Sequence, residues 1–383
     1  MGPTIILDKC VIQSLSQLAI YELNRYFCTN ITPVLLMEIL ADLSLHTENP
    51  HRSAESVQII AHKVCPANAF PNIHYKTLCV NNLFGFPVEM TRHPVVGGVQ
   101  QVTSDDGNIG DYLGITPENE VIMRWQQGFF IESDVIFAKN WRDRIEGINL
   151  EEKNKFISKM WDRKFKSLVE LKQVIDAAMS DHNLQLFFLN WFMDVLCLEP
   201  VYRQLIQNRW DHGEHKSFLT FAPYALHCAR IHVLFHVGIA NHLLSTRSSN
   251  LLDIEYLCYT PFCNIFSSSD KFLKQLAPLV LETDQSFVDG NDLRLELEQI
   301  GALRRGTRDS TSLGSIEPDE KSIIQSLWKK HRGYFVQHQP ITPERSAKIM
   351  EQLKPIMNAA DKVAQNRPSN PHWPLNIQYK TIT

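Results

Sequence analysis

Four acidic residues have the side chains that metal-assisted hydrolysis needs, although they are far apart in the sequence. They are Asp8, Glu38, Asp253 and Asp270. Mg²⁺ and Mn²⁺ prefer oxygen ligands, and a bound divalent ion lowers the pKa of an attacking water and stabilises charge on a phosphodiester. Carboxylates gathered without a cation repel one another, so a metal would stabilise such a cluster. If the fold brings these acids together, their chemistry predicts a phosphodiesterase that uses Mg²⁺ or Mn²⁺.

The elements around these acids indicate how the fold would gather them. Residues 3–8 (PTIILD) form an apolar run that ends in Asp8, and Asp270 follows a second predicted strand, CNIFSS. Functional groups collect at the carboxyl ends of parallel strands, and helices can present Glu38 and Asp253 to the same edge. Another interpretation makes Asp253 and Asp270 simple helix N-caps. Asp8 fits no solvated-face pattern, and burying it without a partner would be costly.

The remaining elements are predicted from periodicity and helix-start residues. A helical pattern runs from Val11 to Phe27, followed by a break at CTNITP, and Thr32 and Pro33 fit the start of the next helix. Residues 46–150 read as irregular, with a small hairpin in RHPVVGGVQQVTSDDGNIGDYLG and a helical pattern over 119–144. Further helices are expected near 151–179, 182–208 and 222–245, the second capped by Asp181 or Asn183 and the third started by Pro223. A flexible loop at 304–321, one or two helices and a Pro-rich tail complete the chain.

Three segments resemble the motifs of one nuclease family. IILDKCVIQSL resembles the opening of PIN-domain nucleases, and PVLLMEILADL resembles their second acid motif. LLDIEYLCYTPFCNIFSSSDKFL resembles their closing module, in which one acid opens a helix and another follows the next strand. The closing pattern is similar to that of a branch of large bacterial PIN-like proteins. Unlike compact PIN domains, this chain has roughly 200 residues between its second and third acids.

The resemblance implies an α/β PIN-like fold, with a parallel sheet flanked by helices. The expected core is discontinuous, 1–45 plus 225–300, with a mainly helical insertion over 46–224 and a C-terminal extension over 301–383. It also implies an endoribonuclease in which Asp8, Asp253 and Asp270 ligate Mg²⁺ or Mn²⁺, and Glu38 positions metal or water. By analogy alone, the chain would be a toxin or phage-defence effector. The expected partner is RNA, together with an inhibitor protein or further copies of the chain in a homo-oligomer.

Three nearby residues extend the candidate site, each with an ordinary alternative. Asp42 lies one turn after Glu38 and either joins the acid cluster or is solvated. Lys9 directly follows the first acid and either pairs with a phosphate or reaches solvent. Arg230, like Arg247, precedes the third acid and either contacts phosphate or forms an ordinary salt bridge, which we favour.

Composition sets few limits on function. The net charge of −4 and the pI near 6.4 do not favour a nucleic-acid binder, but a local basic strip can suffice on a near-neutral body. Eight cysteines form no C-x-x-C pair and read as mostly buried free thiols of a reducing compartment. The chain shows no signal-peptide pattern, and its most apolar stretch, over 225–244, contains Arg230 and four histidines. We therefore expect a cytoplasmic protein without a membrane partner.

Several weaker patterns have both a functional and a purely structural interpretation. His232 and His236 have zinc-compatible spacing but are expected to be core histidines, since no H-E-x-x-H motif is present. Basic residues with interleaved aromatics over 151–172 and 327–335 either contact RNA or form ordinary solvated helices. No P-loop, Rossmann or serine-hydrolase motif occurs. A nuclease acting on DNA and an inactive PIN-like interaction protein remain the alternatives to a ribonuclease.

Overall fold

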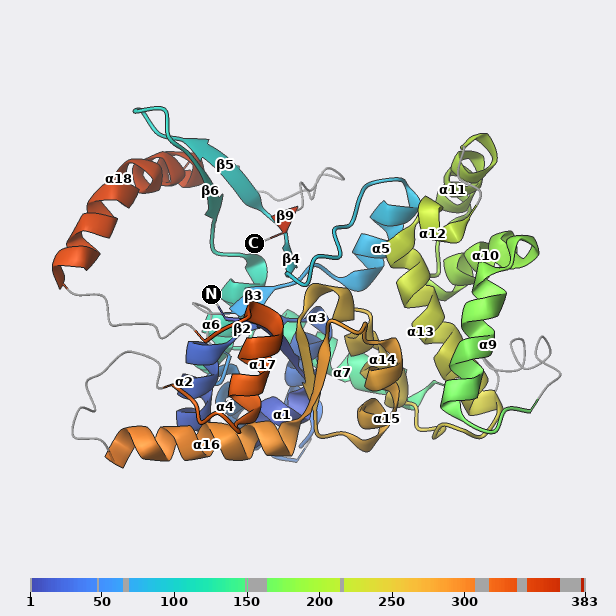
Figure 1. Cartoon of the computed structure of the whole chain (residues 1–383), viewed down its shortest axis with the longest axis horizontal. Coiled ribbons are helices and arrows are strands. Elements are labelled where there is room, and N and C mark those ends of the chain that lie inside the picture. Colours follow the sequence, from blue (N-terminus) through green and yellow to red (C-terminus); the bar gives the residue numbers. More distant parts are fainter. Residues whose placement is uncertain are drawn as a thin grey trace.

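The computed structural model is an α/β structure built on a five-stranded parallel sheet that is flanked by many helices (Figure 1). It describes residues 2–46, 48–64, 69–148, 150, 164–213, 217–306, 317–335, 343–365 and 380–381. The sheet strands are β1 (Thr4–Leu7), β2 (Cys28–Ile31), β3 (Ala69–Pro71), β7 (Ile265–Ser268) and β8 (Ser286–Asp289). The coarse prediction of an α/β sheet is therefore confirmed.

The order of the strands creates a switch point beside β1. The sheet runs β3-β2-β1-β7-β8, and each neighbouring pair is parallel. From β1 the chain builds outward to β2 and β3, then crosses back to place β7 on the other side of β1. In open parallel sheets, a crevice for ligands forms at the carboxyl ends of the strands where the direction of winding reverses. That position lies between the ends of β1 and β7.

Local sequence signals explain the elements nearest this switch point. Every residue of β1 (TIIL) and of β7 (IFSS) is buried, as expected for the centre of a parallel sheet. Helix α1 (Lys9–Ser14) follows β1 at once, and α3 (Pro33–Ala41) starts with Pro33 after the Thr32 cap, as predicted. Helix α15 (Lys271–Val280) follows β7. The order strand, acid, helix therefore occurs twice at the centre of the sheet.

Two predictions near the N-terminus were wrong. The segment CTNITP contains the strand β2 instead of a break. Its local pattern is too short and too polar to predict a strand, and pairing with β1 and β3 is what stabilises it. The helical pattern over 11–27 is divided between α1 and α2 (Gln17–Tyr26), because the chain is extended at Leu15 and Ser16, where Ser16 caps α2.

The helical pattern predicted over 119–144 is present as two helices, but the prediction of irregular structure before it was wrong where α4 (Pro50–Ala61), α5 (Tyr75–Leu83) and β3 lie. The two helices of the pattern are α6 (Pro117–Gln126) and α7 (Glu132–Glu146), and β3 belongs to the sheet. The expected hairpin is present as β5 (Val99–Thr103) and β6 (Ile109–Leu113). Many His, Pro and Asn residues obscured the helical periodicity, while tertiary packing supplied the stability that local propensity lacks.

Helices of the middle segment gather on one side of the molecule (Figure 1). They are α9 (Leu168–Ser180), α10 (Gln185–Val195), α11 (Pro200–His212), α12 (Phe218–Phe221) and α13 (Pro223–Ala240). The short α14 (Asn250–Leu257) contacts both α13 and α3, so it connects this group with the sheet layer. Pro223 begins α13 as predicted, and Asp181 rather than Asn183 provides the cap before α10. The predicted helix near 151–179 lies partly outside the described residues.

The C-terminal region supplies three further helices, α16 (Gly290–Gly306), α17 (Ile323–Arg332) and α18 (Pro343–Gln365). Helix α16 packs along α2 and against α17, while α18 packs on the hairpin of β5 and β6 (Figure 1). Short strands β4 (Val95–Val96) and β9 (Lys380–Thr381) also pair. Most of the predicted flexible loop at 304–321 and of the Pro-rich tail lies outside the described residues. No helix in the described part of the chain is both long and apolar enough to cross a membrane.

Candidate active site at the switch point of the sheet

The first and last predicted acids meet through one serine at the ends of β1 and β7. Ser268, the last residue of β7, donates its hydroxyl hydrogen to Oδ2 of Asp8. The same hydroxyl oxygen accepts the backbone N–H of Asp270 at 3.0 Å. The parallel pairing of β1 with β7 thus brings Asp8 and Asp270 together, although they are 262 positions apart in the sequence.

Asp8 is buried and surrounded by hydrogen-bond donors. Its carboxylate accepts the backbone N–H of Val11 at 2.9 Å, which caps α1, and the thiol of Cys10 at 3.0 Å. Burial raises the pKa of Asp8, against the opposing effect of these hydrogen bonds and that of Ser268. The nearby charge of Asp270 raises this pKa further. Asp8 is therefore a buried acid whose surroundings include another carboxylate.

Asp270 has a capping role as well as a position in the candidate site. Its carboxylate accepts the backbone N–H groups of Phe272 at 2.7 Å and Leu273 at 3.1 Å. The interpretation of Asp270 as an N-cap is thus correct, but capping does not prevent the same carboxylate from ligating a cation. A capping carboxylate retains lone pairs that can accept a further donor or ligate a cation.

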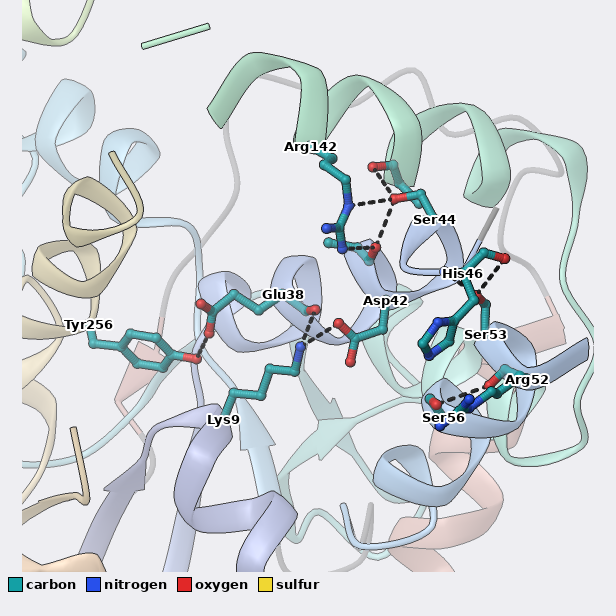
Figure 2. Close-up of polar contacts among 12 residues, drawn as sticks. Lys9, Glu38, Asp42, Ser44, His46, Arg52, Ser53, Ser56, Arg142 and Tyr256 are labelled. Atoms are coloured by element: carbon teal, nitrogen blue, oxygen red, sulfur yellow. Dashed lines mark hydrogen bonds and ion pairs between the residues drawn. The ribbon is translucent and has the colours of Figure 1, made fainter. Parts of the chain in front are cut away.

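Glu38 projects from α3 toward α14, where Tyr256 donates a hydrogen bond of 2.5 Å to its Oε2 (Figure 2). Burial raises the pKa of Glu38 to about 7. The hydrogen bond from Tyr256 and the charge of Lys9 act in the opposite direction, while the charges of Asp8 and Asp42 add to the increase. A glutamate with a pKa near neutrality can exchange protons under physiological conditions.

The charges of the other three acids all act on the pKa of Asp253. It lies in the first turn of α14, one turn before Tyr256 on the same side of the helix. Burial raises its pKa to about 8, and the charges of Glu38, Asp270 and Asp8 all contribute to the increase. The charge of Arg247 acts in the opposite direction. All four predicted acids therefore belong to one electrostatically coupled group.

Lys9 and Asp42 form an ion pair next to Glu38, and both of their charges act on the pKa of that residue (Figure 2). The ammonium of Lys9 lies 2.6 Å from Oδ1 of Asp42 and also donates to the backbone carbonyl of Glu38 at 3.0 Å. Asp42 is buried, so its interpretation as a solvated residue was wrong. Lys9 likewise does not reach freely into solvent, since its side chain holds α1 against the C-terminal half of α3.

Arg230 lies elsewhere, in agreement with the salt-bridge interpretation. Its Nε is 3.7 Å from Oδ1 of Asp176 on α9. Together with His227 it lines a separate cavity of about 340 Å³, and the residues around that cavity include none of the four acids. Arg230 therefore does not belong to the candidate site. Arg247 takes its place, because its charge acts on Asp253.

The weaker patterns mostly have structural explanations. His232 and His236 are 3% and 6% exposed and stack on one another inside α13, as expected for core histidines. In the second basic cluster, Trp328 is buried and Arg332 donates to the carbonyl of Gly2 at 3.0 Å, so both side chains pack on the protein. The first basic cluster lies largely outside the described residues.

The cysteines follow the prediction of mostly buried free thiols. Cys28, Cys79, Cys228, Cys258 and Cys263 are buried and unpaired, and Cys197 is exposed. Cys65 lies outside the described residues.

The four acids suit a hard divalent cation in their chemistry, although their side chains do not form a ready-made ligand group. Within the described ranges, no three His, Cys, Asp or Glu side chains are arranged to hold a metal ion. Three of the four carboxylates are turned toward protein donors, namely Ser268 for Asp8, Tyr256 for Glu38 and backbone amides for Asp270. Burial raises the pKa of Asp253 most, and the charges of Glu38, Asp270 and Asp8 add to the increase, which a bound cation would oppose.

Sequence reasoning did not identify two residues that organise this site. Tyr256 lies three residues after Asp253, so helical spacing could have placed both on one face. Ser268 lies two residues before Asp270, and its role emerges only when β7 pairs with β1.

Comparisons with known proteins add no assignment. No family model matches the chain, and neither the curated proteins nor the solved structures contain a match to it.

Proposed function

We propose that this chain is a metal-dependent endoribonuclease with its active site at the switch point of the sheet. The observation that carries the proposal is the contact of Ser268 with both Asp8 and Asp270 at the ends of β1 and β7. The pKa of Asp253, raised to about 8 by burial and by the charges of Glu38, Asp270 and Asp8, supports it. Structural acids are usually paired with cations or solvated, whereas groups of mutually perturbing carboxylates are frequent at functional sites. Asp8 and Asp270 lie at the carboxyl ends of β1 and β7, where open parallel sheets usually bind their ligands.

The resemblance to PIN-domain nucleases narrows this chemistry to phosphodiester hydrolysis. Asp8, Glu38, Asp253 and Asp270 would hold Mg²⁺ or Mn²⁺, which supplies an activated water and stabilises charge on phosphate oxygens. Glu38, with a pKa of about 7, can hold or release a proton at its carboxylate close to neutral pH. Ser268 and Tyr256 orient the carboxylates of Asp8 and Glu38. RNA as the substrate rests on the resemblance alone.

The proposal is tested by incubating the purified chain with end-labelled single-stranded RNA and DNA in Mn²⁺. We expect RNA cleavage by the wild type and a loss of at least a hundredfold in Asp8→Asn and Asp253→Asn. Asp284→Asn is the matched control, since Asp284 is an exposed aspartate that pairs with Arg92. Cleavage of DNA alone would contradict the ribonuclease proposal and indicate a DNA nuclease of the same fold.

A second candidate function has its own supporting observation. The carboxylates of Asp8, Glu38 and Asp270 each accept a hydrogen bond from a protein donor. The described residues include no group of side chains already arranged to bind a metal. This arrangement suits a catalytically inactive interaction protein that retains the fold as a scaffold. Equal RNA turnover by the wild type and Asp8→Asn, together with no Mn²⁺ binding in calorimetry, would establish this alternative.

A further inference from the structure

The cavity that Arg230 and His227 line lies apart from the four acids. Its volume is about 340 Å³, close to the lower end of the range of about 300–1,000 Å³ that is usual for ligand pockets. Side chains from α9, α13 and α15 line it, together with Leu281 and Glu282, which follow α15. The cavity is therefore separate from the candidate active site, whose acids are not among the lining side chains.

One part of the lining is aliphatic and can be covered by a ligand. Leu279, Val280 and Leu281 line the cavity at the C-terminal end of α15, and all three are half-buried. Ile175 and Ile231 also line it, but each is only 2% exposed and is already buried by the protein. Covering the three half-buried side chains with an aliphatic group would remove apolar surface from water, which favours binding.

The charged part of the lining contains two cations that share one carboxylate. The ammonium of Lys172 lies 2.5 Å from Oδ2 of Asp176. Nε of Arg230 lies 3.7 Å from Oδ1 of the same residue, which is too long for a hydrogen bond. The side chains of Lys172 and Arg230 are 39% and 37% exposed, so both are accessible. Arg230 has the weaker contact of the two and is the better partner for an incoming anion.

The remaining polar side chains limit the charge of that anion. Nε2 of His227 lies 3.2 Å from the carbonyl oxygen of Leu257, and burial lowers the pKa of His227, so its ring adds no charge at neutral pH. Glu282 is exposed, and its charge acts on His227. The carboxylates of Asp176 and Glu282 would repel a dianion such as phosphate more strongly than an anion with one charge.

An accessible guanidinium beside an aliphatic surface selects a class of ligand. A carboxylate pairs well with a guanidinium, because the two groups can form two parallel hydrogen bonds. An aliphatic alcohol would cover the apolar surface without the ionic contact, and inorganic phosphate would contact the cations without covering that surface. A ligand that suits both parts of the lining carries one carboxylate and an aliphatic chain.

We propose that this cavity binds a small monocarboxylate with an aliphatic chain. The carboxylate pairs with Arg230, while Lys172 keeps its contact with Asp176, and the chain covers Val280 and its two neighbours. Such a ligand is either a simple carboxylic acid or an aliphatic α-amino acid, since both have the same carboxylate and chain. This binding does not depend on the proposed nuclease activity.

The first test is calorimetry of the wild-type protein without divalent ions at neutral pH. The probes are acetate, butanoate and hexanoate, with hexan-1-ol and inorganic phosphate as controls. We expect the affinity to rise by up to about fourfold for each added methylene group, as apolar burial predicts. Hexanoate should bind at least tenfold more tightly than hexan-1-ol and than phosphate.

Each part of the proposal has a result that would overturn it. Equal binding of hexanoate and hexan-1-ol would overturn the contact with Arg230, and equal binding of acetate and hexanoate would overturn the aliphatic surface. Binding of phosphate more tightly than hexanoate would overturn the preference for a single charge. No binding of hexanoate at millimolar concentration would overturn the site.

Variants then separate the carboxylate contact from the aliphatic surface. Arg230→Met should lower the affinity for hexanoate at least tenfold and change that for hexan-1-ol less than twofold. Val280→Thr keeps the shape of the side chain but adds a hydroxyl group, so it should weaken hexanoate and leave acetate unchanged. Asp176→Asn removes a carboxylate that competes for Arg230, and it should tighten hexanoate binding, which loss of a merely structural contact would not do.

The matched control is Arg294→Met, because Arg294 is 29% exposed and pairs with Glu298 on α16. This variant should bind hexanoate as the wild type does. A hexanoate affinity that is unchanged in both Arg230→Met and Val280→Thr would contradict the proposal.

Two further arms identify the source of the ligand and keep this site distinct from the nuclease. Leucine and 4-methylpentanoate have the same carbon chain and differ only in the α-ammonium group. Tighter binding of leucine, lost in Glu282→Gln, indicates an amino acid, and equal or tighter binding of 4-methylpentanoate indicates a simple carboxylic acid. Asp8→Asn should bind hexanoate as the wild type does, so loss of cleavage and loss of binding can be recognised separately.

Discussion

The phenol of Tyr256 on α14 donates a 2.5 Å hydrogen bond to Oε2 of Glu38 on α3, across 218 positions of sequence. This contact joins the closing module to the second acid motif, and both lie beside the ends of β1 and β7. It places an uncharged donor on a carboxylate that burial otherwise drives toward its protonated form. Tyr256 is therefore a positioning residue for Glu38.

Replacing Tyr256 with Phe should destabilise the protein and alter the titration of Glu38. Hydrogen bonds to charged groups contribute about 1.5–3 kcal/mol, so we expect a loss of about that size in the free energy of unfolding from urea denaturation. The hydrogen bond lowers the pKa of Glu38, so its removal should raise that pKa above about 7 and move the pH profile of cleavage upward.

The control for this substitution is Tyr21→Phe, because Tyr21 is 65% exposed. An exposed substitution of this kind usually changes stability by less than about 0.5 kcal/mol. If Tyr256→Phe matched this control in both stability and pH profile, the hydrogen bond to Glu38 would have no energetic role.

The stability of the metal-free protein should decrease as the pH rises toward 8. The folded-state pKa of Asp253 is about 8, whereas an aspartate in an unfolded chain titrates near about 3.9. Between these values the folded chain binds more protons than the unfolded chain, so the free energy of unfolding falls with increasing pH. We expect this decrease in EDTA, measured by urea denaturation at several pH values.

Asp253→Asn should flatten this dependence on pH, because the amide does not titrate. Asp284→Asn should not, because the partner Arg92 lowers the pKa of Asp284 and confines its effect to acidic conditions. Mn²⁺ should stabilise the wild type most at the alkaline end, since ligands bind a metal in their deprotonated form. A slope in Asp253→Asn equal to that of the wild type would contradict the raised pKa.

The ion pair of Lys9 with Asp42 should show measurable coupling in a double-mutant cycle. Both side chains are largely shielded from solvent, at 18% and 10% exposure, so removal of one partner leaves the other charge poorly compensated. For Lys9→Met and Asp42→Asn we expect a coupling free energy of about 1–3 kcal/mol in urea denaturation.

The pair Lys362–Asp105 provides the comparison, because its side chains are 65% and 94% exposed. Exposed pairs contribute about 0–1 kcal/mol, so its coupling should be the smaller of the two. Equal coupling for the two pairs would mean that Lys9 does not hold α1 against α3 through its charge.

Local signals were sufficient for much of the framework of the candidate site. The apolar run before Asp8, the Thr32–Pro33 helix start and the order of strand, acid and helix around Asp270 were all predicted, and the structure contains each of them. These features depend on neighbours within a few residues, such as a side chain that accepts from backbone amides in the first turn of a helix. They can therefore be recognised without knowing the rest of the chain.

The short strands depended on distant partners. The strands β2, β3 and β8 have only three or four residues each, too few for a periodic pattern, and pairing in the sheet supplies their stability. Helices α4 and α5 were missed because His, Pro and Asn residues obscure their periodicity, whereas α6 and α7 fall in the helical pattern predicted over 119–144. Short segments are defined by what they pack against, which the local sequence does not contain.

Sequence alone determined which acids stand at the ends of strands and the starts of helices, and it did so through local rules of strand burial and helix capping. Only the tertiary structure decided that β7 lies beside β1, that Ser268 joins Asp8 to Asp270, and that Arg247 rather than Arg230 acts on Asp253. The contact between Ser268 and Asp8 alone spans 260 positions. They arise because burial of the sheet and the helices around it sets the distances between charges, and those distances set the electrostatics of the site.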